Sequence, residues 1–190
     1  DDDVYAMSDW DDAISAIRSA YSTSGDDRRP PGRIFAQTER EWMRIMPSVP
    51  VGGRLFGAKS MVGSFADGLQ VSYLITLFDK DTAELDALVD GNRVTGLRTA
   101  ATTAVRAAAL TPSRQLTLGV VGSGFEARSH VAALSHVLDI AEILVYSPTT
   151  ANRELFAADM GDLVGVPARA VETAREAAGC DVVLCAARSR

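Results

Sequence analysis

The sequence predicts an α/β protein in two parts, an N-terminal α+β part with an antiparallel sheet and then the first half of a parallel, doubly wound sheet. Apolar segments follow one another closely over residues 34–90, with turn residues between them. Residues 116–187 instead alternate short apolar runs with helical segments, as in parallel sheets. The segment Thr111-Pro112-Ser113 separates the two patterns, so the expected domains are residues 1–112 and 113–190.

Length and composition fit a globular protein. The 190 residues correspond to about one to one-and-a-half domains at roughly 150 residues each. The longest apolar run, Val71–Phe78, is far shorter than the roughly 20 residues of a membrane helix, and the acidic N-terminus differs from a basic signal peptide. A net charge of -6 argues against nucleic acid, whose phosphates need a basic surface. We therefore expect a cytoplasmic protein with no nucleic-acid or membrane partner.

The cysteines and histidines indicate neither a disulfide nor a metal site. Cys180 and Cys185 lie five positions apart in an expected strand, which places them on opposite faces, and we interpret them as buried reduced thiols. His130 and His136 have no cysteine at zinc-site spacing and no His-Glu-x-x-His pattern. The sequence thus predicts no metal.

The first part is expected to begin with a helix and to continue as strands. Ser8 is the expected N-cap of a helix in which Trp10, Ile14 and Ile17 recur at helical spacing. Residues 22–33, which include Pro30-Pro31-Gly32, are expected to form a loop. The expected strands are rich in β-branched and aliphatic residues and lie at Trp42–Val49, Arg54–Met61, Leu69–Phe78 and Leu85–Val89.

The second part repeats a strand–helix unit. The expected strands are Leu116–Val121, Glu142–Tyr146, Val166–Val171 and Asp181–Ala187, and the expected helices are Glu126–Val137, Thr150–Met160 and Glu172–Ala178. A complete doubly wound dinucleotide-binding domain has two such halves, and only one is present. The last strand would then be an apolar edge without a partner. We therefore expect the sequence to be a fragment of a longer protein.

A glycine-rich motif lies between the first strand and the first helix of this second part. Gly122-Ser123-Gly124-Phe125-Glu126-Ala127 fits Gly-x-Gly-x-x-Ala in the strand–turn–helix context of a dinucleotide-binding fingerprint. Gly122 would allow the tight turn, and Gly124 would let a pyrophosphate approach the helix N-terminal amides. The alternative is a structural turn without a ligand. The motif predicts a Rossmann-type half domain that binds NAD or NADP.

The end of the second strand distinguishes the two cofactors in such domains. An Asp or Glu there binds the adenosine 2′-hydroxyl of NAD, whereas this strand leads into Ser147-Pro148-Thr149 without an acid. The hydroxyls of Ser147 and Thr149, with Arg153 one turn later, could accept the 2′-phosphate of NADP. Alternatively, these residues only cap the next helix. The sequence therefore favours NADP over NAD.

Three cations precede the nucleotide-binding part. Arg33 ends the expected loop directly after Pro30-Pro31-Gly32, Lys59 interrupts an apolar strand, and Arg98 falls in the first turn of an expected Ala-rich helix, Thr95–Leu110. A positive charge is unfavourable in an apolar strand or at a helix N-terminus unless it has a partner. A bound anion would supply one. Taken singly, each cation is also compatible with an ordinary surface charge.

These motifs together make the sequence similar to the ornithine cyclodeaminase/mu-crystallin family. The most specific similarity is Thr95-Gly96-Leu97-Arg98-Thr99-Ala100-Ala101, followed at a matching distance by the Gly-x-Gly-x-x-Ala loop. Further similarity lies in Met46-Pro47, Gly57-Ala58-Lys59, Gly68-Leu69-Gln70 and Leu77-Phe78-Asp79. The resemblance covers nearly the whole chain.

The resemblance implies an NAD(P)-dependent oxidoreductase that acts on the α-carbon of an amino or imino acid, as an ornithine cyclodeaminase, a ketimine reductase or an alanine dehydrogenase does. It implies that Arg33, Lys59 and Arg98 bind the substrate, with Lys59 catalytic, and that Thr99 contacts the cofactor together with Ser123 to Glu126. The alternative is a non-catalytic ligand-binding or crystallin-type protein on the same fold.

Two further expectations concern the whole protein. The resemblance implies a homodimer formed through the N-terminal domain. It also implies a catalytic Asp beyond Arg190, so the 190 residues by themselves are expected to be inactive.

Overall fold

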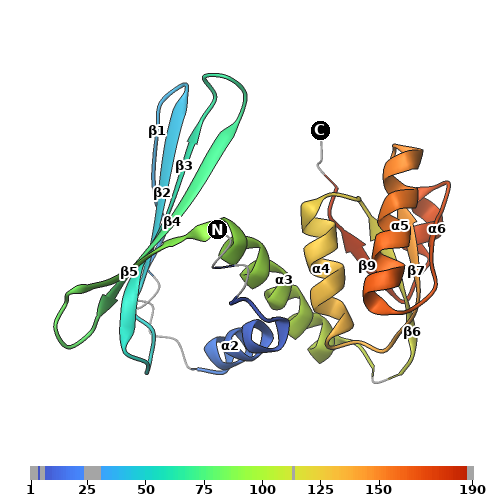
Figure 1. Cartoon of the computed structure of the whole chain (residues 1–190), viewed down its shortest axis with the longest axis horizontal. Coiled ribbons are helices and arrows are strands. Elements are labelled where there is room, and N and C mark those ends of the chain that lie inside the picture. The colour runs from blue at the N-terminus through green and yellow to red at the C-terminus, as the bar shows by residue number, and fades with distance from the viewer. Residues whose placement is uncertain (1–3, 5–6, 24–30, 113, 188–190) are drawn as a thin grey trace. The chain divides into compact units, whose positions relative to one another are not determined.

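The computed structural model describes residues 4, 7–23, 31–112 and 114–187. The chain divides into two compact units, one of residues 1–8 and 19–95 and one of residues 9–18 and 96–190 (Figure 1). Packing therefore divides the chain inside a helix, whereas the sequence places a boundary after residue 112. The domains 1–112 and 113–190 and their roles stay a prediction. Most of the expected loop, residues 24–30, and Ser113 of the expected boundary lie outside the described residues.

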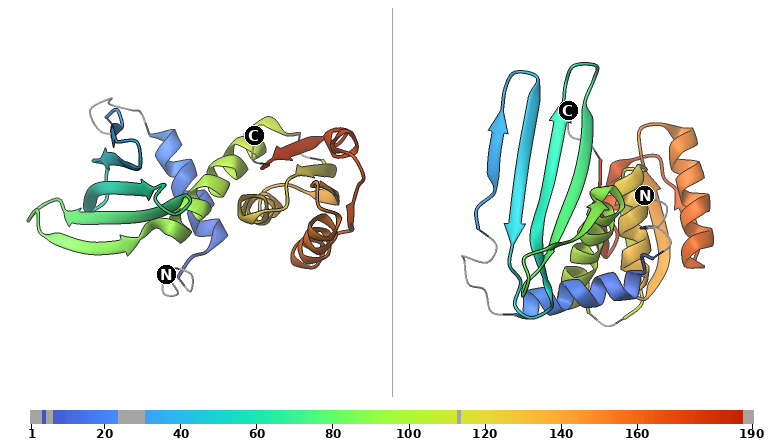
Figure 2. Two further views of the ribbon diagram at one scale, coloured as in Figure 1. Left: turned by 90° about the horizontal axis from the view of Figure 1, so that it is seen from above. Right: turned by 60° about the vertical axis from the view of Figure 1, so that its left-hand side comes forward.

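The sheet of the first unit is a five-stranded antiparallel meander in the order β1-β2-β3-β4-β5, whose strands lie side by side in Figures 1 and 2. The strands are β1 (Ile34–Gln37), β2 (Glu41–Ser48), β3 (Leu55–Ser64), β4 (Gln70–Asp79) and β5 (Leu85–Asp90). The expected antiparallel sheet is confirmed. Strands β3 and β4 approach so closely that a Cβ at Gly57 would lie 1.9 Å from the carbonyl oxygen of Thr76.

One face of this sheet carries exposed apolar side chains on every strand. Residues directly opposite each other in an antiparallel sheet share a face, and the register pairs Met43 with Val62. The exposed apolar residues that this register places on one face are Ile34, Met43, Val62, Leu74 and Leu88. Their exposed fractions range from 37% to 60%. Lys59 lies on the opposite face, in the row that pairs it with Met46 and Ile75.

Helix α2 (Trp10–Ser22) begins at a different cap from the expected one. The Asp9 carboxylate accepts the backbone N–H groups of Asp11 and Asp12 at 2.8 and 3.1 Å. Ser8 was therefore the wrong N-cap, since the Asp9 carboxylate accepts the orphan amides of the first turn.

Helix α3 (Gly91–Leu110) begins four residues before the expected start at Thr95. Asp90 explains the difference, because its carboxylate accepts the backbone N–H of Asn92 at 2.8 Å. Arg98 consequently lies in the second turn and is exposed. The expectation that it falls in the first turn of the helix is wrong.

The second unit contains a four-stranded parallel sheet in the order β8-β7-β6-β9. The strands are β6 (Leu116–Val121), β7 (Ile140–Tyr146), β8 (Ala168–Ala170) and β9 (Val182–Cys185), and the helices are α4 (Phe125–Ser135), α5 (Thr150–Val164) and α6 (Ala174–Ala178). This confirms the expected parallel sheet, with β9 at one edge. A Cβ at Gly119 of β6 would lie 1.8 Å from the carbonyl oxygen of Ala177, so α6 packs directly against the β6 backbone.

The two cysteines are free but are not buried as expected. Cys180 is half-buried and precedes β9, and Cys185 is exposed at the end of that strand. The expectation is wrong because β9 is an edge strand that pairs only with β6 among the described residues. Burial nevertheless raises the pKa of the Cys180 thiol.

The described residues show neither a membrane-spanning helix nor a cluster of metal-binding side chains. None of their helices combines the length and the apolar character that a bilayer crossing requires. No group of three or more His, Cys, Asp or Glu side chains among these residues is arranged to hold a metal ion.

Candidate functional site

The glycine-rich loop follows β6, one of the two inner strands of the parallel sheet, at its carboxyl end. Gly122 has a φ of +121°, and a Cβ there would lie 2.7 Å from the carbonyl oxygen of Ala186. Gly124 is the N-cap of α4, which has no side-chain cap, and a Cβ on Gly124 would meet no atom within 4 Å. The backbone is thus unobstructed at Gly124, and helix N-terminal amides without a side-chain cap suit an anionic group such as a pyrophosphate.

Two serine hydroxyls connect this loop to the end of β7. Ser123 Oγ donates to Ser147 Oγ at 3.0 Å, and Ser147 Oγ donates to the carbonyl oxygen of Thr149 at 3.4 Å. Ser147 is buried, so its hydroxyl group contributes to the hydrogen bonds that hold these segments together. Thr149 is exposed and is the N-cap residue of α5, yet no side chain caps that helix. The N-terminus of α5 therefore also presents open amides beside the end of β7.

A buried arginine lies against the same strand end. Arg153 is 5% exposed, and its Nη1 donates to the carbonyl oxygen of Ser147 at 3.2 Å. Its Nη2 donates to Glu172 Oε2 at 2.6 Å. The Arg153 Nε has no hydrogen-bond partner in the described part of the chain. The Glu172 side chain, by contrast, is 82% exposed.

Glu172 is a site residue that sequence reasoning missed. It follows β8 and reaches Arg153 because β8 pairs with β7 in the sheet. The sequence shows an acid after the third strand, but only the strand order places that acid beside the end of the second strand. An acid at the carboxyl end of any strand next to β7 is the signal that could have identified it.

Three other expected cofactor residues lie at or near the N-terminus of α4. A Cβ at Gly96 would lie 2.9 Å from the Phe125 ring, so α3 passes close to the start of α4. Thr99 follows Gly96 by three positions and therefore lies on the same side of α3. Phe125 and Glu126 form the exposed first turn of α4.

Lys59 is held by partners within its own unit. Its ammonium group donates to the hydroxyl of Thr95 in α3 and lies 4.8 Å from the centre of the Tyr73 ring. Lys59 also borders an open hollow of about 250 Å³ that Met46 and Ile75 help to line. A hydroxyl and an aromatic face thus stabilise a cation in an apolar strand.

Arg33 is exposed and directly precedes β1. The register pairs Ile34 with Ile45, so extension by one residue places Arg33 opposite Met46, which itself pairs with Lys59. Two strand spacings, roughly 10 Å, therefore separate the backbones at Arg33 and Lys59. The convergence of both residues with Arg98 on one anion stays a prediction.

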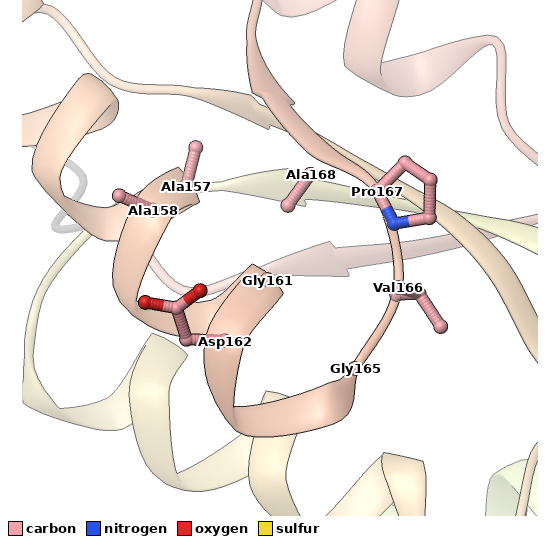
Figure 3. A pocket seen from close by; sticks show the side chains of 8 residues that line it. All are labelled: Ala157, Ala158, Gly161, Asp162, Gly165, Val166, Pro167 and Ala168. Carbon is pink, nitrogen blue, oxygen red and sulfur yellow. The ribbon is translucent and has the colours of Figure 1, made fainter.

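A second hollow, of about 510 Å³, lies between the end of α5 and β8. Figure 3 shows that mostly short side chains line it, with Asp162 as the one carboxylate among the labelled residues. No cation is among the lining residues to bind a phosphate or a carboxylate. The loop after β6, with its neighbours at the ends of β7 and β8, is therefore the candidate site.

Several known proteins are similar to this chain in sequence or in fold. Residues 3–190 match the model of the ornithine cyclodeaminase/mu-crystallin family. An alanine dehydrogenase of Archaeoglobus fulgidus is 28% identical over 193 residues, which cover 100% of this chain and 59% of that protein. Thermococcus litoralis Δ1-pyrroline-2-carboxylate reductase, solved with NADH and L-proline, matches with a TM-score of 0.84 and 26% identity over 97% of this chain and 59% of its own.

An archaeal alanine dehydrogenase dimer with bound NAD gives the same TM-score of 0.84 at 25% identity, and the match covers 97% of this chain and 58% of that one. The chain thus spans less than two thirds of the length of these relatives.

Proposed function

Because the chain belongs to the ornithine cyclodeaminase/mu-crystallin family, we propose that the protein is an NAD(P)-dependent oxidoreductase acting on the α-carbon of an amino or imino acid. Cyclodeamination, ketimine reduction and alanine dehydrogenation are the candidate reactions. The observation that carries this proposal is the loop after β6, where Gly122 has a positive φ and Gly124 leaves open space before the uncapped start of α4.

The residues around this loop suit a dinucleotide. The first-turn amides of α4 would hold the pyrophosphate, with Ser123, Phe125 and Glu126 beside it and Thr99 on the neighbouring face of α3. The nicotinamide, when bound, would supply the hydride chemistry. We favour NADP over NAD, since the end of β7 lacks an acid and the exposed Thr149 hydroxyl and open α5 amides lie there.

We further propose that Arg33, Lys59 and Arg98 bind the substrate. Lys59 is already held by Thr95, and Arg98 lies three positions after Thr95 on the same helix, hence on a neighbouring position of one face. Arg98 would orient the carboxylate through its planar fork. The Lys59 ammonium would then stabilise negative charge that develops near the reacting carbon, which makes it the proposed catalytic residue.

Two properties of the whole protein belong to this proposal. A homodimer would bury the apolar face of the five-stranded sheet. A cytoplasmic location stays a prediction from composition, and the inactivity of the 190 residues by themselves stays a prediction from the resemblance.

Gly124→Val tests the nucleotide site. The added side chain starts where no protein atom lies within 4 Å, so the fold should persist while the valine methyls fill the space before α4. We expect at least a ten-fold weaker affinity for both NADH and NADPH, measured by calorimetry. Gly32→Val is the matched control, because its Cβ also meets no atom within 4 Å. Unchanged affinity in a folded Gly124→Val protein, checked by circular dichroism, would contradict the proposal.

A further inference from the structure

We propose that Arg153 and Glu172 form a selectivity switch at the adenosine end of the site. The Glu172 carboxylate is bound to the Arg153 guanidinium until the 2′-phosphate of NADP replaces it. This inference rests on the proposed dinucleotide function and adds the residues that choose between the two cofactors. Glu172 is thus a specificity-determining residue that opposes NADP binding, and Arg153 is the residue for which the Glu172 carboxylate and the 2′-phosphate compete.

The state of Arg153 is the first argument. A guanidinium has five N–H donors, and this one is buried with one bond to the Ser147 carbonyl and one to Glu172. Its Nε is buried without a partner among the described residues. A buried charge whose donors are only partly used has capacity for a stronger acceptor.

The exposure of Glu172 is the second argument. Its side chain is 82% exposed while it covers an arginine side chain that is only 6% exposed. An exposed carboxylate can turn into solvent at little packing cost, and its departure would leave Nη2 without this acceptor. A phosphate dianion carries more charge than a carboxylate and accepts bidentate bonds from the same fork.

The surroundings of the pair are the third argument. Ser147, the residue in the usual position for cofactor selection, is buried and its hydroxyl bonds to Thr149 within the loop. The exposed Thr149 hydroxyl and the open amides of α5, a helix of 15 residues, supply further donors at the same strand end. The phosphate would thus meet a cation, a hydroxyl and a helix N-terminus together.

The opposite assignment would make Glu172 a ligand of the NAD ribose, in place of the acid that Ser147 lacks. The pair geometry disfavours this, because the Glu172 carboxylate is already bound to Arg153 at 2.6 Å. The two assignments predict opposite effects when Glu172 loses its charge.

Binding of two cofactor fragments to the full-length protein separates the assignments. The probes are 2′,5′-ADP, which carries the 2′-phosphate, and 5′-AMP, which does not, with affinities measured by calorimetry near 0.15 M salt. Glu172→Gln should strengthen 2′,5′-ADP binding at least ten-fold and change 5′-AMP binding less than two-fold. Glu154→Gln is the control, since it removes the same charge from an exposed position beside Arg153 on α5.

A second variant tests the target of the phosphate. Adding Arg153→Met to Glu172→Gln should abolish the gain for 2′,5′-ADP. If the double variant does not fold, Arg153→Lys in the same background should lose most of the gain, because a lysine lacks the fork.

The outcomes distinguish the two proposals. If the full-length protein and its Glu172→Gln variant bind neither fragment nor either intact cofactor, the proposed function itself fails. If the fragments bind but Glu172→Gln leaves their affinity ratio unchanged, or weakens 5′-AMP instead, only the switch is overturned.

Discussion

Lys59 illustrates at the residue scale how a cation is accommodated in an apolar strand. The Thr95 hydroxyl accepts from its ammonium group, and the Tyr73 ring faces that charge at 4.8 Å. A hydroxyl and an aromatic face thus both contribute to holding the ammonium group in the strand.

Arg98→Lys tests the substrate site. The substitution keeps the charge but removes the planar fork, and loss of one such contact should cost about 2–4 kcal/mol, or about 30- to 1,000-fold in kcat/KM. Initial rates of imine reduction by the full-length protein would show the effect. Arg106→Lys, at an exposed position two turns later on α3, should change the rate little. Wild-type activity in the Arg98→Lys protein would remove Arg98 from the proposed site.

The Asp181 carboxylate connects the start of β6 with the start of β9. It accepts the backbone N–H of Thr117 at 2.8 Å, the Thr117 hydroxyl at 3.0 Å and the Arg114 guanidinium at 2.6 Å. The Thr117 amide, the Arg114 bond and the Thr117 hydroxyl lower the pKa of the Asp181 carboxyl to about 2.

The lowered pKa gives a stability prediction with a definite sign. The pKa is 3.8 before the shift, so the ionised carboxylate stabilises the fold fully above that pH and loses this contribution as the pH falls toward 2. Asp181→Asn should therefore lower the Tm clearly at pH 7 and much less near pH 2, measured by circular dichroism. Asp162→Asn, at an exposed position of α5, is the control. An equal loss at both pH values would show that the carboxylate charge is not the cause.

The elements also show which parts of the fold can be predicted from sequence. The bounds of β6 match the expected Leu116–Val121, because a buried parallel strand is a continuous apolar run between turn residues. The expected start of α3 was wrong because Asp90, the last residue of β5, also caps the helix, so no turn residues separate the strand from the helix. The expected start of α5 at Thr150 is exact, by contrast, because Pro148 precedes that helix and marks its beginning.

The candidate site likewise contains residues that the sequence could predict and residues that it could not. The Gly122–Gly124 loop was predictable, because the strand, turn and helix that define it are consecutive in sequence. Glu172 was not, because its contact with Arg153 depends on the pairing of β8 with β7. Thr149 was predicted as a site residue, but its uncapped state at α5 is visible only in the structure.

At the scale of the whole molecule, the five-stranded sheet has an apolar face that requires a cover. Ile34, Met43, Val62, Leu74 and Leu88 leave that face exposed on every strand. A contiguous patch of this kind marks an interface in soluble proteins. A second copy of the chain is the proposed partner, and the archaeal relative with bound NAD is a dimer.

Leu74→Glu tests the dimer. A carboxylate on the central part of this face would have to be buried without a partner in the proposed dimer. We therefore expect a monomer at micromolar concentration in sedimentation velocity, whereas the unaltered protein is expected to sediment as a dimer. Leu163→Glu adds the same charge at a 59% exposed leucine of α5 and should leave the dimer intact. A Leu74→Glu protein that still sediments as a dimer would place the interface elsewhere.

Gly119 imposes a limit on any attempt to redesign the cofactor site. Its missing side chain lets the Ala177 carbonyl oxygen approach to 1.8 Å from where a Cβ would be, so any side chain at position 119 would push α6 away from β6. A mutant library aimed at cofactor choice can therefore vary the exposed Thr149 and Glu172, but variants at position 119 are expected to be lost to misfolding before their selectivity is assayed.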